Sequence, residues 1–155
     1  MVIAVITVSD RASRGEYEDL SGPAITGILS ADWPQANITN DIVPDGEASV
    51  LAALERNKNA DWVITTGGTG PSPRDLTPEA SARFCDRELP GLSEYFRSKS
   101  LEQTPNAVFS RCYSGMKGKT YVVNFPGSLK AAIFHAELLS PLLGHGIDMA
   151  LGKGH

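Results

Sequence analysis

The sequence has few cysteines, no long apolar run and no excess of positive charge, and each shortage excludes a class of protein. Cys85 and Cys112 are too far apart for a metal knuckle or a Cys-x-x-Cys redox pair, so we expect reduced thiols in the cytoplasm. The apolar start, Met1–Val8, lacks a basic region and is too short to span a bilayer. A net charge of -4 argues against broad attraction to nucleic acid or anionic lipid. We therefore expect a cytoplasmic protein with no nucleic-acid or membrane partner.

Several catalytic signatures are missing as well. Gly118-Lys119-Thr120 resembles the end of a P-loop, but the first glycine of that motif would fall at Tyr113. His135–Glu137 resembles part of a zinc-deaminase signature, yet no Pro-Cys-x-x-Cys accompanies it, and a surface or core histidine is the simpler interpretation. No Gly-x-Ser-x-Gly elbow is present, and the glycines at 67–70 lack dinucleotide-binding spacing. Zinc, serine-hydrolase and dinucleotide chemistry therefore have little support.

The 155 residues, 41% of them hydrophobic, predict a single domain over residues 1–155 with a sizeable core. Apolar, β-branched runs predict strands, and 3.6-residue periodicity with caps and breakers predicts helices. The expected strands are Val2–Val8, Asn37–Val43, Asp61–Thr65 and Thr120–Phe125, the second near a sheet edge. The expected helices begin at Ser21, Glu47, Thr77, Leu92 and Leu129. This alternation predicts an α/β fold, a three-layer α/β/α sandwich with a mainly parallel sheet.

The remaining segments are predicted from their polarity and their glycine and proline content. Ser13–Asp19 and Ser110–Gly115 are expected to be loops. The last helix is expected to end at Leu143 with a glycine cap, and 144–155 to be frayed or bound to a partner. The side chains expected to be buried in the last two helices are Leu92, Tyr95, Phe96, Leu101, Ile133, Leu138 and Leu142.

The stretch Thr65–Glu79 is the strongest functional signal. It joins a buried strand to a helix through three glycines, and Thr77 before Pro78 predicts an N-cap and a first-turn proline. Glycines admit a ligand close to backbone N–H groups, and a helix N-terminus favours an anion. A plain chain-reversing turn is the alternative, but such a turn needs neither the cation of Arg74 nor the carboxylate of Asp75. We therefore expect this loop to bind phosphate.

Other candidate residues follow the ends of the expected strands. Because parallel strands end at one edge, the segments near Ser9, Asp45, Gly67 and Pro126 should meet on one rim, where ligands bind in open α/β sheets. Two structural alternatives stay open. Ser9 and Asp10 could form a simple turn after the first strand, and Asp45 could cap the next helix.

Three motifs in this chain resemble the signatures of the Mog/MoaB molybdopterin-binding family. They are Thr66–Gly70, Arg74–Glu79 and Val123–Ser128. Ser9–Arg11 and Asp19–Gly22 also fit, so the resemblance covers almost the whole chain. It implies a compact α/β domain of the MoaB/Mog-like fold, usually a homotrimer. It also implies molybdenum cofactor biosynthesis, in which AMP passes from ATP to molybdopterin and pyrophosphate leaves, with Mg²⁺ required.

The resemblance implies further partners and leaves alternatives open. A separate molybdenum insertase would receive the adenylylated molybdopterin. A MoaB-like protein that binds molybdopterin with little or no adenylyltransferase activity is the main alternative, and a scaffold or regulatory domain is a more distant one. Molybdenum and tungsten pathways are not distinguished at this level.

The resemblance also assigns residues. Asp45 and Asp75 match the two carboxylates of catalytic members and would hold Mg²⁺. Ser110, Gly115 and Ser128 are expected on loops over the rim, where they would hold the pterin and its phosphate arm. The full set of expected substrate-binding residues is Ser9, Asp10, Thr66, Gly67, Gly68, Thr69, Gly70, Thr77, Ser110, Gly115, Asn124, Pro126, Gly127 and Ser128.

Overall fold

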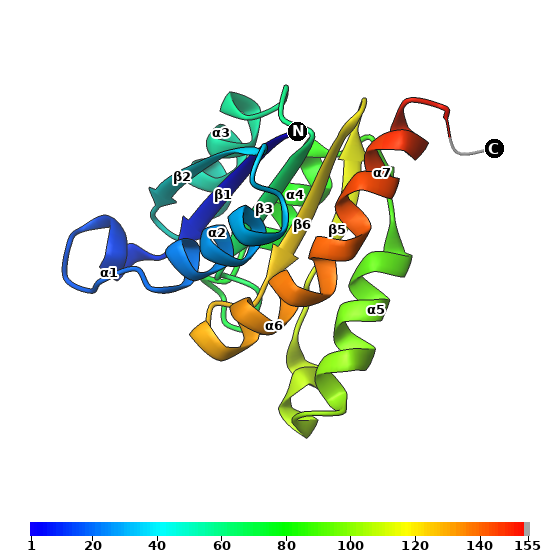
Figure 1. Cartoon of the computed structure of the whole chain (residues 1–155). Helices are drawn as coiled ribbons and strands as arrows, with labels where there is room; N and C mark the ends of the chain where they lie inside the picture. The colour runs from blue at the N-terminus through cyan, green and yellow to red at the C-terminus, as the bar shows by residue number, and fades with distance from the viewer. Residues whose placement is uncertain (154–155) are drawn as a thin grey trace.

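The computed structural model describes residues 1–153, and within this range six strands form one sheet with helices on both faces (Figure 1). The sheet order is β2-β1-β3-β6-β5-β4. The strands are β1 (Val2–Val8), β2 (Asn37–Val43), β3 (Trp62–Thr66), β4 (Arg87–Glu88), β5 (Ser114–Lys117) and β6 (Thr120–Phe125). The α-helices are α1 (Asp10–Ser13), α2 (Ser21–Asp32), α3 (Glu47–Arg56), α4 (Thr77–Phe84), α5 (Pro90–Leu101), α6 (Leu129–Leu139) and α7 (Leu143–Ala150). Two 3₁₀ helices are η1 (Pro105–Phe109) and η2 (Ser140–Leu142). The predicted three-layer α/β/α sandwich is confirmed.

The sheet is parallel on one side and antiparallel on the other. β2, β1, β3 and β6 run parallel, whereas β5 pairs antiparallel with both β6 and β4. The four parallel strands therefore end at the same edge, and β2 lies at the border of the sheet as predicted. The expected loop at 110–115 is wrong at its end, because Ser114 and Gly115 belong to β5. This short strand is formed by pairing with β6 across a tight hairpin, so its own sequence carries no strand pattern.

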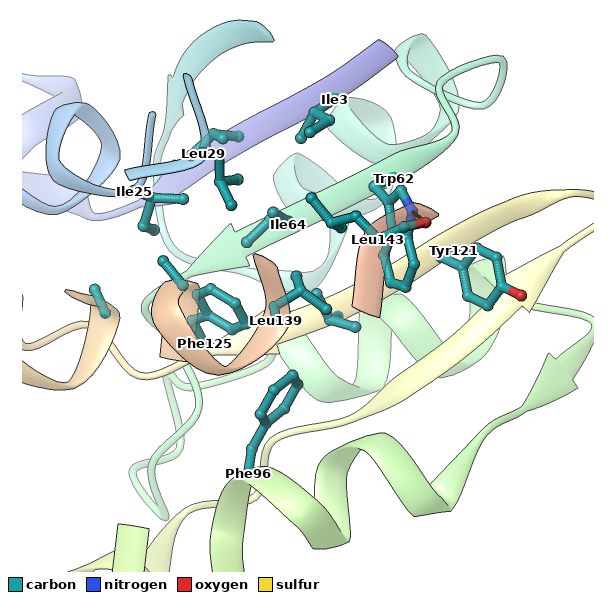
Figure 2. Packing of buried hydrophobic residues seen from close by; sticks show 14 of the residues in the cluster. Ile3, Ile25, Leu29, Trp62, Ile64, Phe96, Tyr121, Phe125, Leu139 and Leu143 are labelled. Atoms are coloured by element: carbon teal, nitrogen blue, oxygen red, sulfur yellow. Dashed lines mark hydrogen bonds between the residues drawn. The ribbon is translucent and has the colours of Figure 1, made fainter. Parts of the chain in front are cut away.

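The continuous apolar run of β1 is explained by burial on both faces. Ile3 and Val5 point into one cluster, formed with α2, α5, α6 and α7, whereas Ala4, Ile6 and Val8 point into the other, formed with α3 and α4. Figure 2 shows the first cluster, where Trp62 and Tyr121 lie side by side and Phe96 reaches in from α5. Trp62 and Tyr121 stack with ring centroids 4.2 Å apart. The alternation expected of a half-exposed strand is absent because neither face meets water.

The C-terminal helix differs from the prediction. The expected single helix from 129 to 143 ends at Leu139, passes through η2 at Pro141 and restarts as α7. Proline has no backbone N–H to continue the α-helical bonds, so the turn around it tightens. Gly144 lies inside α7 and is not a cap, and the helix replaces the frayed end expected there; residues 154 and 155 lie outside the described part.

Several side chains that were predicted to be buried are exposed or only partly buried. Tyr95 and Leu101 of α5 are 37% and 44% exposed, so their expected burial is wrong, while Phe96 is buried as expected. In α6 and η2 the side chains of Ile133, Leu138 and Leu142 are only partly buried. The buried residues are Ala132, His135, Ala136 and Leu139 in α6, Ser140 in η2 and Leu143 in α7.

Within residues 1–153 both cysteines are free thiols, as expected. Cys85 is partly buried and Cys112 is buried. None of the helices in this part of the chain combines the length and the apolar character needed to cross a membrane.

Candidate functional site

The carboxyl ends of β1, β3 and β6 enclose a cleft of about 480 Å³. Six of the predicted residues line it, and they are Ser9, Thr66, Gly67, Gly68, Gly127 and Ser128. The predicted convergence of strand ends on one rim is therefore confirmed for these segments. The lining residues outside the predicted set are Thr7, Val8, Ala12, Tyr17, Asp19, Leu20, Ser21 and Leu129.

The floor of the cleft is the glycine loop after β3. Gly67 and Gly68 have φ angles of +106° and +64°, which side-chain-bearing residues rarely adopt. A Cβ atom at Gly67 would collide with the carbonyl oxygen of Val8, and one at Gly68 with the hydroxyl of Thr77. The backbone therefore lies directly against its neighbours. Within residues 1–153 the N–H of Gly68 has no protein acceptor, which leaves it available to an anion.

Thr77 has a different role from the predicted one. It is the first residue of α4, and the preceding residue, Leu76, is an N-cap without a side-chain hydrogen bond. The Thr77 hydroxyl donates to the Gly67 carbonyl at 2.9 Å, and the Thr77 N–H donates to the Gly68 carbonyl at 3.1 Å. The N-cap prediction is wrong because the buried hydroxyl holds the glycine loop instead of the helix end.

Two other helix N-termini border the cleft. Leu20 and Ser21 at the start of α2, and Ser128 and Leu129 at the start of α6, line its wall. Ser128 caps α6 as predicted, accepting from the N–H of Ala131 at 3.4 Å. The partial positive charge at the cleft therefore comes from α2 and α6. In the sequence, a serine at the start of each helix is the signal for these positions. Ser128 is an expected site residue, whereas Ser21 is expected only to begin a helix.

The carboxylate of Asp19 also reaches this cleft, but donors surround it. It accepts from the Thr7 hydroxyl at 2.7 Å and from the N–H groups of Ser21 and Gly22 at 3.1 Å each. These bonds offset its negative charge and anchor the start of α2. A phosphate in the cleft would therefore meet a carboxylate whose oxygens are already hydrogen-bonded.

A second, smaller pocket of about 250 Å³ adjoins the cleft, and three aspartates and three arginines line it. We call it the acidic pocket after its aspartates. The lining residues are Ser9, Asp10, Arg11, Arg14, Asp45, Arg74 and Asp75. Asp45 and Asp75 thus face the same pocket although they follow different strands, and Ser9 belongs to both cavities. Within residues 1–153 no group of three or more His, Cys, Asp or Glu side chains is arranged to hold a metal ion.

Asp45 is tied to the loop after β1. Its carboxylate accepts from the N–H of Asp10 at 2.9 Å, and the Asp10 carboxylate accepts from the N–H of Asp45 at 3.0 Å. The N-cap position of α3 is Gly46, so the interpretation of Asp45 as a helix cap is wrong. Burial raises the pKa of Asp45, and the negative charge of Asp75 raises it further. The two carboxylates therefore interact electrostatically.

Ser9 and Asp10 form the turn that the sequence left open, and they also lie at the rim. Ser9 accepts from the N–H of Ala12 at 3.2 Å and caps the short helix α1, so it does form a turn. It also lines both cavities, and Asp10 lines the acidic pocket, where it forms an ion pair with Arg74. The turn is the means by which β1 presents these side chains at the rim.

The other predicted residues lie away from the two cavities. Gly115 is buried in β5, and the fully buried Asn124 donates to the hydroxyls of Thr65 and Ser81 at 2.9 Å each. Ser110 and Pro126 line a separate cavity of about 200 Å³ beside His135. Thr69 is buried, and Gly70 packs against the Asp75 carboxylate.

Comparisons with known proteins agree with this geometry. A family model described as a probable molybdopterin binding domain matches residues 4–145. The chain is 39% identical to the molybdopterin adenylyltransferase of Helicobacter pylori strain J99, over 97% of this chain and 88% of that protein. Its fold matches a solved MogA structure with a TM-score of 0.90 at 34% identity, covering 97% of this chain and 99% of that one.

A solved MoaB of Pyrococcus furiosus, described as a tungsten cofactor synthesizing protein, matches with a TM-score of 0.86 at 37% identity over 96% of each chain. These matches extend over nearly the whole length, so they concern the complete sheet and the rim loops together. The resemblance inferred from the loop motifs is confirmed, and the chain belongs to the Mog/MoaB molybdopterin-binding family.

Proposed function

We propose that this protein is a molybdopterin adenylyltransferase of molybdenum cofactor biosynthesis. An oxygen of the terminal phosphate of molybdopterin bonds to the α-phosphorus of ATP, and the bond from that phosphorus to the bridging oxygen breaks to release pyrophosphate. The observation that carries this proposal is the acidic pocket of Asp45 and Asp75. It shares Ser9 with the cleft of about 480 Å³ above Gly67 and Gly68, which we call the glycine cleft. The name of the Helicobacter pylori relative supports it.

The glycine cleft is proposed to hold the phosphate arm of molybdopterin. The unpaired N–H of Gly68 and the starts of α2 and α6 supply donors and partial positive charge without a mobile side chain. The tight backbone at Gly67 keeps this surface fixed before the substrate arrives. In this arrangement the phosphate oxygen that reacts lies beside Ser9, at the boundary with the acidic pocket.

The acidic pocket is proposed to hold the nucleotide together with Mg²⁺. The donor set fits this ion, because Mg²⁺ prefers carboxylate oxygens and takes one or two of them along with substrate phosphates, so no complete protein cage is needed. Asp75 and Asp45 would hold the ion, which neutralises charge on the triphosphate. The raised pKa of Asp45 also fits, since a cation would relieve its repulsion with Asp75.

Other parts of the proposal extend beyond these two cavities. Ser110 is proposed to contact the pterin from the cavity beside His135, next to the end of β6. Gly115, Asn124 and Thr77 are proposed to support the rim from within the fold and not to touch substrate. A single cytoplasmic domain, a homotrimer and transfer of the product to a molybdenum insertase remain proposals.

The experiment is to incubate the protein with molybdopterin, ATP and Mg²⁺ and to detect adenylyl-molybdopterin together with pyrophosphate. A matched control is Asp148→Asn, which removes an exposed carboxylate of α7 and should leave turnover unchanged. Binding of molybdopterin with no adenylylated product would favour the MoaB-like alternative. That outcome is given weight by the likeness to the Pyrococcus furiosus MoaB.

A further inference from the structure

The loop that carries Asp75 forms few hydrogen bonds with the rest of the protein. Residues 71–74 are exposed, and the bonds inside the loop are local, such as the Ser72 N–H donating to the Asp75 carboxylate at 3.0 Å. Arg74 forms an ion pair with Asp10. Apart from that pair, within residues 1–153 every hydrogen bond that reaches residues 69–75 from outside comes from Arg111.

Arg111 binds both ends of this loop at once. Its N–H donates to the Thr69 carbonyl at 2.9 Å, and its Nε donates to the Gly70 carbonyl at 2.9 Å. Its Nη2 donates to the carbonyl of Asp75. Because the guanidinium group is planar, these bonds fix the separation between the two ends of the loop.

Arg111 is itself held at its guanidinium group and at the backbone on either side of it. Glu79 of α4 pairs with both terminal nitrogens, and this pairing lowers the pKa of Glu79. On the other side, Arg97 of α5 donates to the carbonyl groups of Ser110 and Cys112, the two neighbours of Arg111, at 3.1 and 3.2 Å. Arg111 therefore connects the glycine loop to α4 and, through its own backbone, to α5.

This connection reaches the carboxylate of Asp75. A Cβ atom on Gly70 would lie 2.9 Å from the Asp75 Oδ2, so this carboxylate lies beside the Gly70 backbone, in space that a side chain would occupy. A shift of the Gly70 carbonyl relative to that of Asp75 would change where this carboxylate lies relative to Gly70. We propose that Arg111 is a positioning residue that sets the location of the Asp75 carboxylate. This inference rests on the proposed function for its effect on turnover, but not for its effect on the loop.

The first test needs no substrate. Amide hydrogen exchange at Ser72 and Asp75, followed by NMR, reports the bonds that hold the carboxylate in place. We expect Arg111→Ala to accelerate exchange at these amides by about tenfold or more, with core amides unchanged. Arg111→Lys should also accelerate exchange, because a point-like ammonium cannot replace a planar fork. Unchanged exchange in both variants would overturn the inference, whether or not the protein transfers AMP.

The second test separates positioning from general support of the fold. We expect Arg111→Lys to lower kcat by about 10- to 100-fold, while molybdopterin affinity and the melting temperature stay near wild type. Arg83→Lys is the matched control. Arg83 lies on α4, the helix that carries Glu79, and forms an exposed ion pair with Glu47 of α3. A parallel fall in affinity, melting temperature and kcat would show a structural role only.

A double-mutant cycle with Asp75→Asn gives the sharpest result. If Arg111 acts through Asp75, Arg111→Lys should have little further effect on kcat once Asp75 is replaced. Losses that multiply would show that Arg111 acts by another route and would contradict the inference. If the wild-type protein has no transfer activity, the proposed function fails, and the hydrogen-exchange result still decides the role of Arg111.

Discussion

The two halves of strands β3 and β6 show how one sheet serves two purposes. Near their amino ends, Trp62 and Tyr121 stack against each other and border an apolar groove of about 390 Å³. At their carboxyl ends, the same strands lead into Gly67 and Gly127, which line the cleft of about 480 Å³. The side chains of the first region pack against each other. The second region leaves backbone groups and carboxylates open to a ligand.

The two regions also differ in how their side chains contribute to the stability of the fold. Core side chains gain stability by leaving water, whereas Asp45 and Asp75 stay close together although their charges repel. Substitutions in the core should therefore lower stability, and substitutions at the rim should lower turnover with little effect on stability. The following predictions test this separation, from the largest expected change in free energy to the smallest.

Replacing Phe96 should have the largest effect. Phe96 is 1% exposed and packs edge-on against Phe125, with centroids 5.5 Å apart. We expect Phe96→Ala to lower the free energy of unfolding by about 3–5 kcal/mol, measured by urea denaturation. The matched control is Phe109→Ala, because Phe109 is 64% exposed and should change stability by less than about 0.5 kcal/mol. Similar losses in both variants would contradict the assignment of the core.

Replacing Asp75 should lower turnover without lowering the stability of the fold. We expect Asp75→Asn to lower turnover by at least about 10²-fold, or about 2.7 kcal/mol, through loss of a charge contact in the transition state. Asparagine can still accept from the Ser72 N–H, so the melting temperature should not change. Molybdopterin binding should also remain. Unchanged turnover would remove Asp75 from its proposed role.

His135 should make the core sensitive to pH. It is 1% exposed, and burial lowers its pKa to about 4, below the ordinary 6.5 that the unfolded chain would have. Below pH 6.5 the unfolded state binds the proton more tightly, so stability should fall as the pH drops from 6.5 toward 4. Between pH 7 and pH 5 we expect a loss of about 2 kcal/mol in urea denaturation. His135→Leu should lack most of this dependence, and equal slopes for the two proteins would contradict the assignment.

Replacing Asp45 should give the smallest change in stability. Asp45→Asn removes a carboxylate whose pKa is raised by burial and by Asp75, so at pH 7 the free energy of unfolding should stay level or rise by less than about 1 kcal/mol. As the pH falls through the raised pKa, the wild-type carboxyl becomes neutral and the difference should disappear. Turnover should fall in the same variant. Marked destabilisation would show that the main role of Asp45 is to stabilise the fold and not to take part in the reaction.

Much of the fold could be predicted because its signals are local. The bounds of β1, β2 and β6 match the predicted ones, and those of β3 are each shifted by one residue. In contrast, β4 and β5 are short and have no apolar pattern, because they exist through pairing with a neighbour. The break at Pro141 was not predicted, because whether a proline kinks, ends or restarts a helix depends on what packs around it.

The candidate site was predicted in part for the same reason. The glycine loop, Ser9, Asp10, Asp45, Asp75 and Ser128 could be named because each follows a predicted strand or begins a helix. The functional role of these residues remains a prediction. The roles of Thr77 and Asp45 as helix caps were wrong, since a threonine or aspartate beside a helix start looks the same in sequence whether it binds that helix or another loop.

The sequence by itself determined the alternation of strands and helices, the continuous apolar faces of the parallel strands and the glycine backbone of the loop after β3, since all of these depend on near neighbours in the chain. Only the tertiary structure decided which distant groups meet. Asp45 bonds to Asp10 across 35 positions, and Arg111 reaches Asp75 across 36. Strand order and packing set such contacts, and no local pattern encodes them.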